Sequence, residues 1–203
     1  MLNDKKMKRN NYIFICLFVL FHNCTEQTTP KKEILNKDFN WRIIIPENFD
    51  TVSSSEWAKM QNRGADAVEK TFEAKVENRS KTIFVFTSDQ HNYFESNYQP
   101  FDTTIDGNYL ESCHNVNKIL YETFIAQMPN IKIDTAASVE KIDGLDFQTF
   151  KMKVTYPNNM VLNVFLFSRL FGNKEFSVNI MYVDTEKGKL MLDSWKNSKF
   201  GRN

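Results

Sequence analysis

The sequence predicts a single α+β domain, in which an antiparallel sheet of about six strands is covered by helices. Residues 147–183 read as three consecutive strands joined by two tight turns. Three other segments carry apolar residues at helical spacing, which gives each of them one apolar stripe. The expected order is strand, helix, strand, loop, helix, strand, then a run of strands and a closing helix. That order favours an antiparallel sheet with helices packed on it.

The run at residues 147–183 is the most regular part of the chain. Met152, Val154 and Tyr156 alternate with lysine and threonine, the period-two pattern of a strand with one buried face. The next strand, Val161–Phe171, is apolar on both faces apart from three residues, so we expect it near the centre of the sheet. The turns are expected at residues 157–159 and 172–174, and the third strand at 176–183.

The remaining elements follow from capping and periodicity. Ser53 followed by Glu56 has the form of a capping box at the start of a helix. Pro129 stops a second helix, and Asp143-Gly144 suits a hairpin turn. The expected elements are a strand at 39–45, a helix at 54–72, a strand at 82–87, a long polar and aromatic loop at 89–106, a helix at 108–128, a strand at 131–139 and a helix at 185–197.

Composition and charge exclude some classes of function. The 203 residues are 41% hydrophobic and 25% charged, with a formal net charge of +1, which suits one soluble domain. Residues 1–23 hold four of the 26 basic side chains and one of the 25 acidic ones, so the rest of the chain carries 22 basic and 24 acidic groups. This balance argues against a nucleic-acid binder, which needs clustered lysine and arginine.

The amino terminus has the pattern of an export signal. A basic stretch at residues 5–9 precedes an apolar run at 12–21 that is too short to span a bilayer. Cys24 follows directly, where a bacterial lipoprotein signal places the cysteine that receives acyl chains such as palmitate. Residues 20–24 resemble a lipobox, with His22 and Asn23 in place of the usual small residues. The alternative is a plain amino-terminal membrane anchor with Cys24 incidental.

These patterns divide the chain into three parts. We expect a signal peptide at 1–23, a flexible tether at 24–37 after lipidated Cys24, and one α+β domain at 38–203. Either reading of the amino terminus places the domain outside the cytoplasmic membrane. The lipoprotein reading predicts a cell-envelope protein on the periplasmic or surface side, held to a membrane by a lipid anchor at Cys24.

The body of the chain resembles a known fold. Its first strand ends in Ile45-Pro46, a helix and a long hairpin sheet follow, and the closing helix contains Ser-Trp-Lys-Asn-Ser-Lys-Phe at 194–200. Over residues 39–200 this resembles the PsbP-like fold. When Cys24 and the composition are considered with this resemblance, the chain is similar to Bacteroidetes lipoproteins that carry a PsbP-like domain. The resemblance implies a binding or assembly role and transfers no catalytic residue.

Motifs of common enzyme classes are missing from the sequence. The six glycines are isolated, which excludes phosphate-binding and dinucleotide-binding loops. No nucleophile elbow, HExxH motif or paired CxxC motif occurs, so we expect no cofactor and no metal. Cys113 and His114 are adjacent on a helix and point about 100° apart, so we interpret Cys113 as a small buried apolar residue rather than a nucleophile.

The candidate binding residues lie in the predicted loop at 89–106. They are Asp89, His91, Tyr93, Glu95 and Tyr98, because polar and aromatic side chains on long loops often serve function. The simpler interpretation is a solvated loop held by its aromatic residues. The leading hypothesis is therefore a non-enzymatic envelope lipoprotein that binds a partner protein or a small ligand.

Two alternative functions remain open. One is a hydrolase or metal-dependent enzyme centred on the same loop, with His91 acting beside Asp89 or Glu95. The other is a carrier of a small apolar ligand, which requires a closed apolar cavity between a helix and the sheet.

Overall fold

A computed structural model describes residues 32–201 of the chain. The predicted signal peptide, Cys24 and residues 25–31 of the predicted tether lie outside the described residues. The elements are β1 Glu33–Asn36, β2 Trp41–Ile44, β3 Asp50–Thr51, α1 Ser54–Phe72, β4 Lys81–Asp89, β5 Asn92–Pro100, α2 Tyr109–Gln127, β6 Lys132–Ile142, β7 Leu145–Thr155, β8 Val161–Phe171, β9 Lys174–Tyr182, α3 Thr185–Lys196 and β10 Lys199–Phe200.

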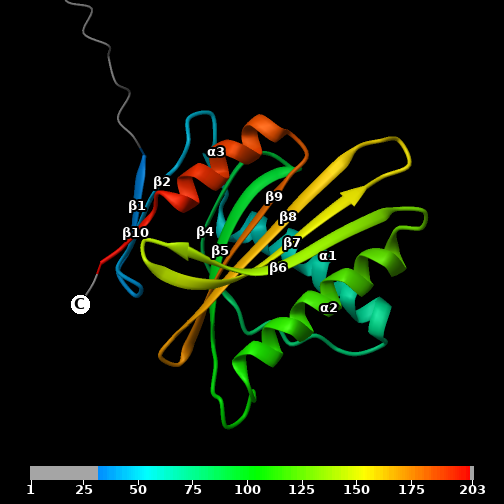
Figure 1. Cartoon of the computed structure of the whole chain (residues 1–203), viewed down its shortest axis with the longest axis horizontal. Helices are drawn as coiled ribbons and strands as arrows, with labels where there is room; N and C mark the ends of the chain where they lie inside the picture. Colours follow the sequence, from blue (N-terminus) through cyan, green and yellow to red (C-terminus); the bar gives the residue numbers. More distant parts are fainter. Residues whose placement is uncertain (1–31, 202–203) are drawn as a thin grey trace, which may run out of the picture.

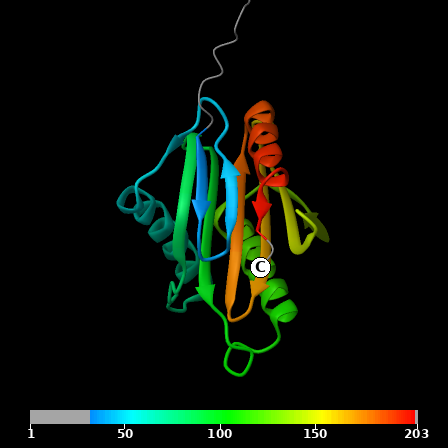
Figure 2. The ribbon, with the colours of Figure 1, turned by 90° about the vertical axis from the view of Figure 1, so that its left-hand side faces the viewer.

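The predicted α+β fold is confirmed. Seven strands form one antiparallel sheet in the order β3-β4-β5-β9-β8-β7-β6, and β1, β2 and β10 form a small second sheet. Helices α1 and α2 lie together against one face of the large sheet (Figure 1). Helix α3 and the small sheet lie on the opposite side (Figure 2). The described part of the chain therefore has three layers, with the large sheet in the middle.

The three predicted helices begin and end close to the expected residues. Ser53 caps α1 by accepting a hydrogen bond from the backbone N–H of Glu56. Asn108 and Asp184 cap α2 and α3 in the same way, each accepting from two backbone N–H groups. A capping side chain satisfies amides that the first helical turn leaves unpaired, so these residues determine where each helix starts.

The hairpins are also where the sequence predicts them. Asp143 and Gly144 both adopt positive φ, 48° and 80°, in the turn between β6 and β7. Gly172 does the same between β8 and β9. Two-residue hairpins need this left-handed backbone, which glycine and aspartate tolerate well. The resulting ladder pairs Met152 with Val164 and aligns the apolar faces of the three strands.

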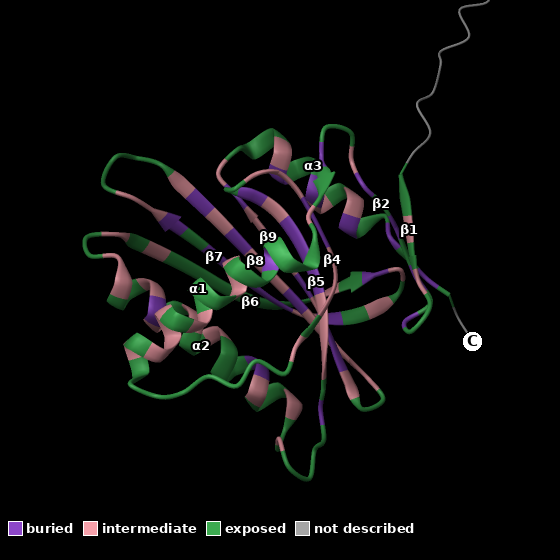
Figure 3. Cartoon of the chain, turned by 180° about the vertical axis from the view of Figure 1, so that it is seen from behind, coloured by how far each residue is buried: buried purple, intermediate pink, exposed green. Residues whose placement is uncertain are grey.

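The face beneath α3 and the small sheet forms the main core. Trp41 of β2 and Trp195 of α3 are fully buried, and their rings lie 6.0 Å apart in an edge-to-face arrangement. Around them pack further aromatic rings from several strands: Phe39, Phe84, Phe86, Phe94, Phe147, Phe167, Phe176 and Phe200. The buried parts of the central strands are visible in Figure 3, whereas the edge strand β6 is mostly exposed.

The predicted boundary between tether and domain is wrong. Residues 33–36, expected in the tether, form β1, which pairs antiparallel with β2. Ile45 donates its backbone N–H to the carbonyl of Lys32, and Ile34 packs against the aromatic core. Pairing with β2 satisfies the backbone groups of this segment, so the folded domain begins before residue 38.

The predicted loop at 89–106 is also wrong for most of its length. Residues 92–100 form β5, which lies between β4 and β9 and pairs Phe94 with Ile180. Alternate side chains of β5 point to opposite faces, so Phe94 enters the aromatic core while Glu95 lies under α1. The segment resembles a loop in sequence because its helix-covered face is polar. Only the stretch at 101–108 connects β5 to α2 without regular structure.

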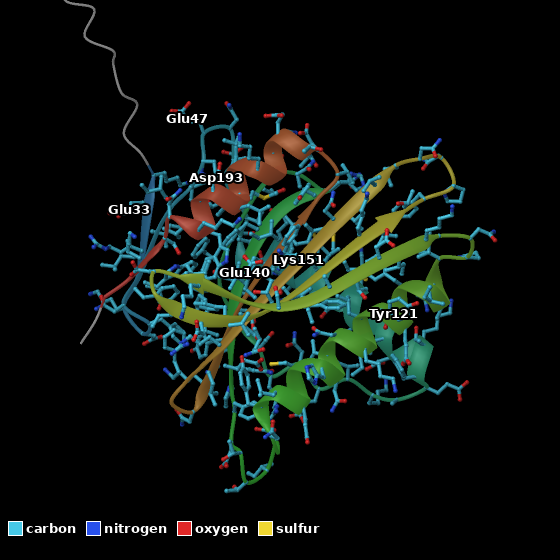
Figure 4. All side chains as sticks on the ribbon, in the orientation of Figure 1. Glu33, Glu47, Tyr121, Glu140, Lys151 and Asp193 are labelled. Atoms are coloured by element: carbon cyan, nitrogen blue, oxygen red, sulfur yellow. The ribbon has the colours of Figure 1, made fainter. Side chains whose placement is uncertain are left out.

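The outer strand β6 leaves one edge of the large sheet exposed. Lys151 of β7 and Glu140 of β6 form an ion pair of 2.6 Å beside this edge, and Figure 4 shows both side chains.

Within residues 32–201, no helix is long and apolar enough to cross a membrane.

Candidate functional site

The helix-covered face of the central strands carries a row of polar side chains. Glu175, Ser177 and Asn179 occupy alternate positions of β9 and therefore point the same way. The strand register places Asn179 opposite Glu95 of β5 and Ser177 opposite Ser168 of β8. The centre of this face is therefore polar, although it lies beneath two helices.

Glu95 is fully engaged in holding α1 to the sheet. Its side chain is 7% exposed, and Oε1 accepts hydrogen bonds from Trp57 Nε1 at 2.7 Å and Gln61 Nε2 at 2.8 Å. Oε2 accepts a third from Asn179 Nδ2 at 3.0 Å. Three donors are enough to compensate a buried carboxylate. Glu95 therefore has a structural role.

A cavity of about 260 Å³ lies between the first half of α2 and strands β6 to β9. Its polar lining comes mainly from β7, β8 and β9, and its apolar lining from α2, β6, β7 and β8. The lining residues are Cys113, His114, Val116, Asn117, Ala137, Ser138, Val139, Gln148, Thr149, Phe150, Leu166, Phe167, Ser168, Glu175, Ser177 and Asn179. The cavity is thus of mixed character, and it includes one buried acid.

Glu175 is the buried acid of this cavity, and it differs from Glu95. Its side chain is 7% exposed, and Oε2 accepts one hydrogen bond from Gln99 Nε2 at 2.7 Å. No residue in the described part of the chain bonds to its other oxygen. Burial raises the pKa of Glu175 above its usual range, the bond from Gln99 opposes that shift, and the negative charge of Asp106 adds to it.

The thiol and phenol beside the cavity are not prepared for nucleophilic chemistry. Tyr109 donates its hydroxyl to Ser168 Oγ at 3.0 Å, and Cys113 Sγ lies 3.5 Å from the same oxygen. Burial raises the pKa of the Cys113 thiol and that of the Tyr109 hydroxyl. A protonated thiol is a poor nucleophile. Cys113 is buried on the helix and its neighbour His114 is exposed, consistent with the prediction that they do not face each other.

Two of the predicted site residues organise the turn between β4 and β5. Asp89 accepts hydrogen bonds from Lys187 Nζ at 2.8 Å, from the backbone N–H of His91 at 2.9 Å and from the side chain of Asn92. Burial acts to raise the pKa of Asp89, but these bonds outweigh it and the pKa lies below its usual range. His91 is exposed in the turn itself.

The other three predicted residues lie further along β5 and on different faces. Tyr93 packs its ring against Trp57 at 4.9 Å, and burial followed by the charge of Glu95 raises its pKa. Tyr98 points to the opposite face, where it meets Phe39 at 5.6 Å. Tyr93 and Glu95 thus share Trp57 as a partner, Asp89 and His91 form the turn, and Tyr98 lies on the other face, so the five residues are not brought into one cluster. In residues 32–201 no three histidine, cysteine or acidic side chains form a group that could hold a metal.

Sequence reasoning missed the residues that do line the cavity. Glu175, Ser177 and Asn179 alternate with Phe176, Val178 and Ile180, a pattern that predicted the strand correctly. This alternation places the strand but does not indicate what covers its polar face. The apolar stripe of the helix predicted at 108–128 was a signal, since such a helix must cover some face of the sheet. The sequence does not say which face it covers.

Comparison with known proteins supports the fold. No protein-family model matches the chain, and no curated protein matches it. Among solved structures, the PsbP protein of Synechocystis sp. PCC 6803, CyanoP, is similar with a TM-score of 0.54 at 10% identity, over 89% of this chain and 99% of that one. A protein of Bacteroides thetaiotaomicron is similar with a TM-score of 0.44 at 9% identity, over 86% of this chain and 50% of that one.

LpqN of Mycobacterium tuberculosis, described as involved in cell envelope biogenesis, is similar with a TM-score of 0.40 at 10% identity, over 87% of this chain and 88% of that one. At 10% identity, the likeness to CyanoP bears on the fold alone. The described domain has a PsbP-like fold.

Proposed function

We propose that the protein is an exported, lipid-anchored and non-enzymatic binding module, and that its ligand occupies the cavity between α2 and the large sheet. The anchor is Cys24, and the domain acts in the cell envelope. The observation that carries the proposed site is the buried carboxyl of Glu175, which lines the cavity with one oxygen lacking a partner among the described residues. A carboxyl oxygen that lines a cavity and has no protein donor there is available to a ligand that carries a hydrogen-bond donor.

The arrangement of the polar groups favours binding over catalysis. The cavity contains an acid, hydroxyls and amides, but its thiol stays protonated and the described part of the chain places no base beside a nucleophile. General acid–base chemistry needs a matched pair within hydrogen-bond reach of the substrate. The cluster of Asp89, His91 and Glu95 that an enzyme would need is split between a solvent-exposed turn and the contact with α1.

A carrier of a purely apolar ligand fits the cavity poorly. The lining includes Glu175, Gln148 and Asn179 beside its apolar residues. An apolar ligand would remove water from these groups without replacing its hydrogen bonds. The ligand is therefore expected to carry both polar and apolar parts.

Lipid anchoring is tested by metabolic labelling of the full chain with a palmitate analogue. We expect the label in wild-type protein and none in Cys24→Ala. Cys113→Ala, which removes the cysteine that the folded domain buries, serves as the matched control and should remain labelled. An unlabelled wild-type protein would refute the anchor at Cys24.

Occupancy of the cavity is tested by native mass spectrometry of protein purified from its own envelope. Wild-type protein is expected to carry an additional small molecule, and Ser177→Phe, which fills the cavity, to lack it. The control is Ser55→Phe, placed on an exposed position of α1, which should keep the molecule. If wild type and Ser177→Phe show the same bound species, the ligand lies elsewhere and the proposed site is wrong.

A further inference from the structure

We infer that the cavity between α2 and the large sheet accepts a small molecule with a protonated amine group and a short apolar part. This rests on the proposed function, because it assigns a ligand class to the proposed site. The inference follows from three properties of the lining: its charge, its hydrogen-bond acceptors and its apolar patches.

The charge of the lining favours a cation. Glu175 is the acid of the cavity, and no lysine or arginine is among the lining residues. His114 of α2 also lines the cavity and is exposed to solvent. An anionic ligand would have to approach a buried carboxyl with no basic partner in the described part of the chain, which is electrostatically unfavourable.

The acceptors on β9 suit a group with several N–H donors. One oxygen of Glu175 accepts no hydrogen bond from the described residues. Asn179 donates its Nδ2 to Glu95, which leaves its carbonyl oxygen available, and Ser177 Oγ stands between the two positions. Alternate residues of a strand project to the same side, so these acceptors form one row. An ammonium group has three donors and no acceptor.

The apolar part of the lining limits the rest of the ligand. Val116 of α2, Val139 of β6, Phe150 of β7 and Leu166 of β8 supply apolar surface to the cavity. A bare metal ion would leave these surfaces uncovered, and the described residues contain no cluster of three metal-binding side chains. A short alkyl chain attached to the amine would cover them.

Binding of an amine should be linked to the proton of Glu175. The titratable groups around this carboxyl are Asp106 on the β5–α2 connection and Tyr109, Cys113 and His114 on α2. Burial keeps the hydroxyl and the thiol neutral, since it raises the pKa of each. An arriving ammonium favours the carboxylate, so affinity should increase as the pH rises through the pKa of Glu175.

The test compares three ligands of four carbon atoms each with full-length protein: n-butylamine, n-butanol and n-butyrate. Binding is measured at neutral pH by titration of the backbone amide signals of Ser177 and Asn179. We expect wild type to bind the amine at least about tenfold more tightly than the alcohol or the acid, the scale of one charge-assisted hydrogen bond. Glu175→Gln should lose that preference, because it keeps the shape and removes the charge.

The matched control is Glu111→Gln, which neutralises an exposed acid on α2 and should keep the preference for the amine. Equal or tighter binding of n-butanol or n-butyrate by wild type, or an unchanged preference in Glu175→Gln, would overturn the ligand class. If wild type binds none of the three while native protein still carries a bound molecule that Ser177→Phe lacks, the amine assignment fails and the proposed function stands. If native protein carries nothing either, both fail.

Discussion

The two faces of the seven-stranded sheet are both covered, yet they are filled with different chemistry. Beneath α3 and the small sheet, Trp41, Trp195 and their neighbouring phenylalanines contact one another in a continuous aromatic core. Beneath α1 and α2, an apolar cluster around Val154 and Leu162 adjoins a polar region that contains Glu95 and Glu175.

The aromatic face mainly stabilises the fold, whereas the polar face contains the proposed ligand site. Aromatic packing contributes stability through burial and ring contacts. The polar face instead places acids where water is scarce, which lowers stability unless each acid finds partners. Glu95 finds three among the described residues, whereas Glu175 finds one. Variants on the two faces should therefore behave differently.

The largest effect is expected from the aromatic face. Trp195→Ala should lower the free energy of unfolding by about 3–5 kcal/mol, because it opens a cavity among several rings and detaches α3. Urea denaturation followed by circular dichroism measures the change. Lys196→Ala, the exposed neighbour, should stay within about 0.5 kcal/mol of wild type. A cost below about 1 kcal/mol for Trp195→Ala would contradict the central role of this core.

A smaller loss of stability is expected when the contact between α1 and the polar face of the sheet is removed. Glu95→Ala leaves Trp57 Nε1, Gln61 Nε2 and Asn179 Nδ2 without their acceptor and should cost about 2–3 kcal/mol. Gln61→Ala removes one donor and should cost about 1 kcal/mol. Hydrogen exchange should show earlier opening of α1 in Glu95→Ala. If Glu95→Ala cost no more than Gln61→Ala, the carboxylate would not be the anchor of the helix.

Glu175→Gln should raise the free energy of unfolding, in contrast to the variants above, and the increase should depend on pH. Because burial raises the pKa of Glu175, the folded state binds its proton more tightly than the unfolded state does. This contribution to stability is full below the unfolded pKa and is lost as the pH rises through the folded pKa. The glutamine variant should therefore be about 1 kcal/mol more stable than wild type at pH 8. Thermal denaturation between pH 4 and 8 should show the two curves converging at the acidic end.

The smallest effect is expected at the turn between β4 and β5. Asp89 and Lys187 form an ion pair whose side chains are 39% and 36% exposed. Because solvent screens such a pair, Asp89→Asn should lower the free energy of unfolding by no more than about 0.5 kcal/mol. The pKa of Asp89 is lowered, so its contribution is present above the unfolded pKa and is lost as the pH falls through the folded pKa. The difference from wild type should shrink at acidic pH in denaturant titrations, and a difference that grows there would contradict this.

Much of the fold could be predicted because its signals are local. Helix starts depend on capping side chains such as Ser53 and Asn108, and hairpins depend on residues that accept positive φ, such as Gly144. These requirements involve a few neighbouring residues. The order of the central strands followed from the same turns.

The errors occurred where a segment depends on distant partners. β1 is four residues long and is a strand because β2 lies beside it. β5 is a strand although one of its faces is polar, because β4 and β9 pair with it and α1 covers that face. Neither condition can be read from the segment alone. The same reason explains why the predicted site residues did not converge: the alternation of a strand sent Tyr93 and Tyr98 to opposite faces.

By itself, the sequence determined the α+β class, the three helices and the meander of β7, β8 and β9. It also led to the expectation of an exported chain whose mature form begins at Cys24. Tertiary structure alone decided that Glu175, Ser177 and Asn179 face a helix rather than water, and that they border a cavity. The physical reason is that strand alternation divides side chains between two faces but carries no information about what covers each face. That depends on where α1, α2 and α3 pack, which residues far apart in the sequence decide together.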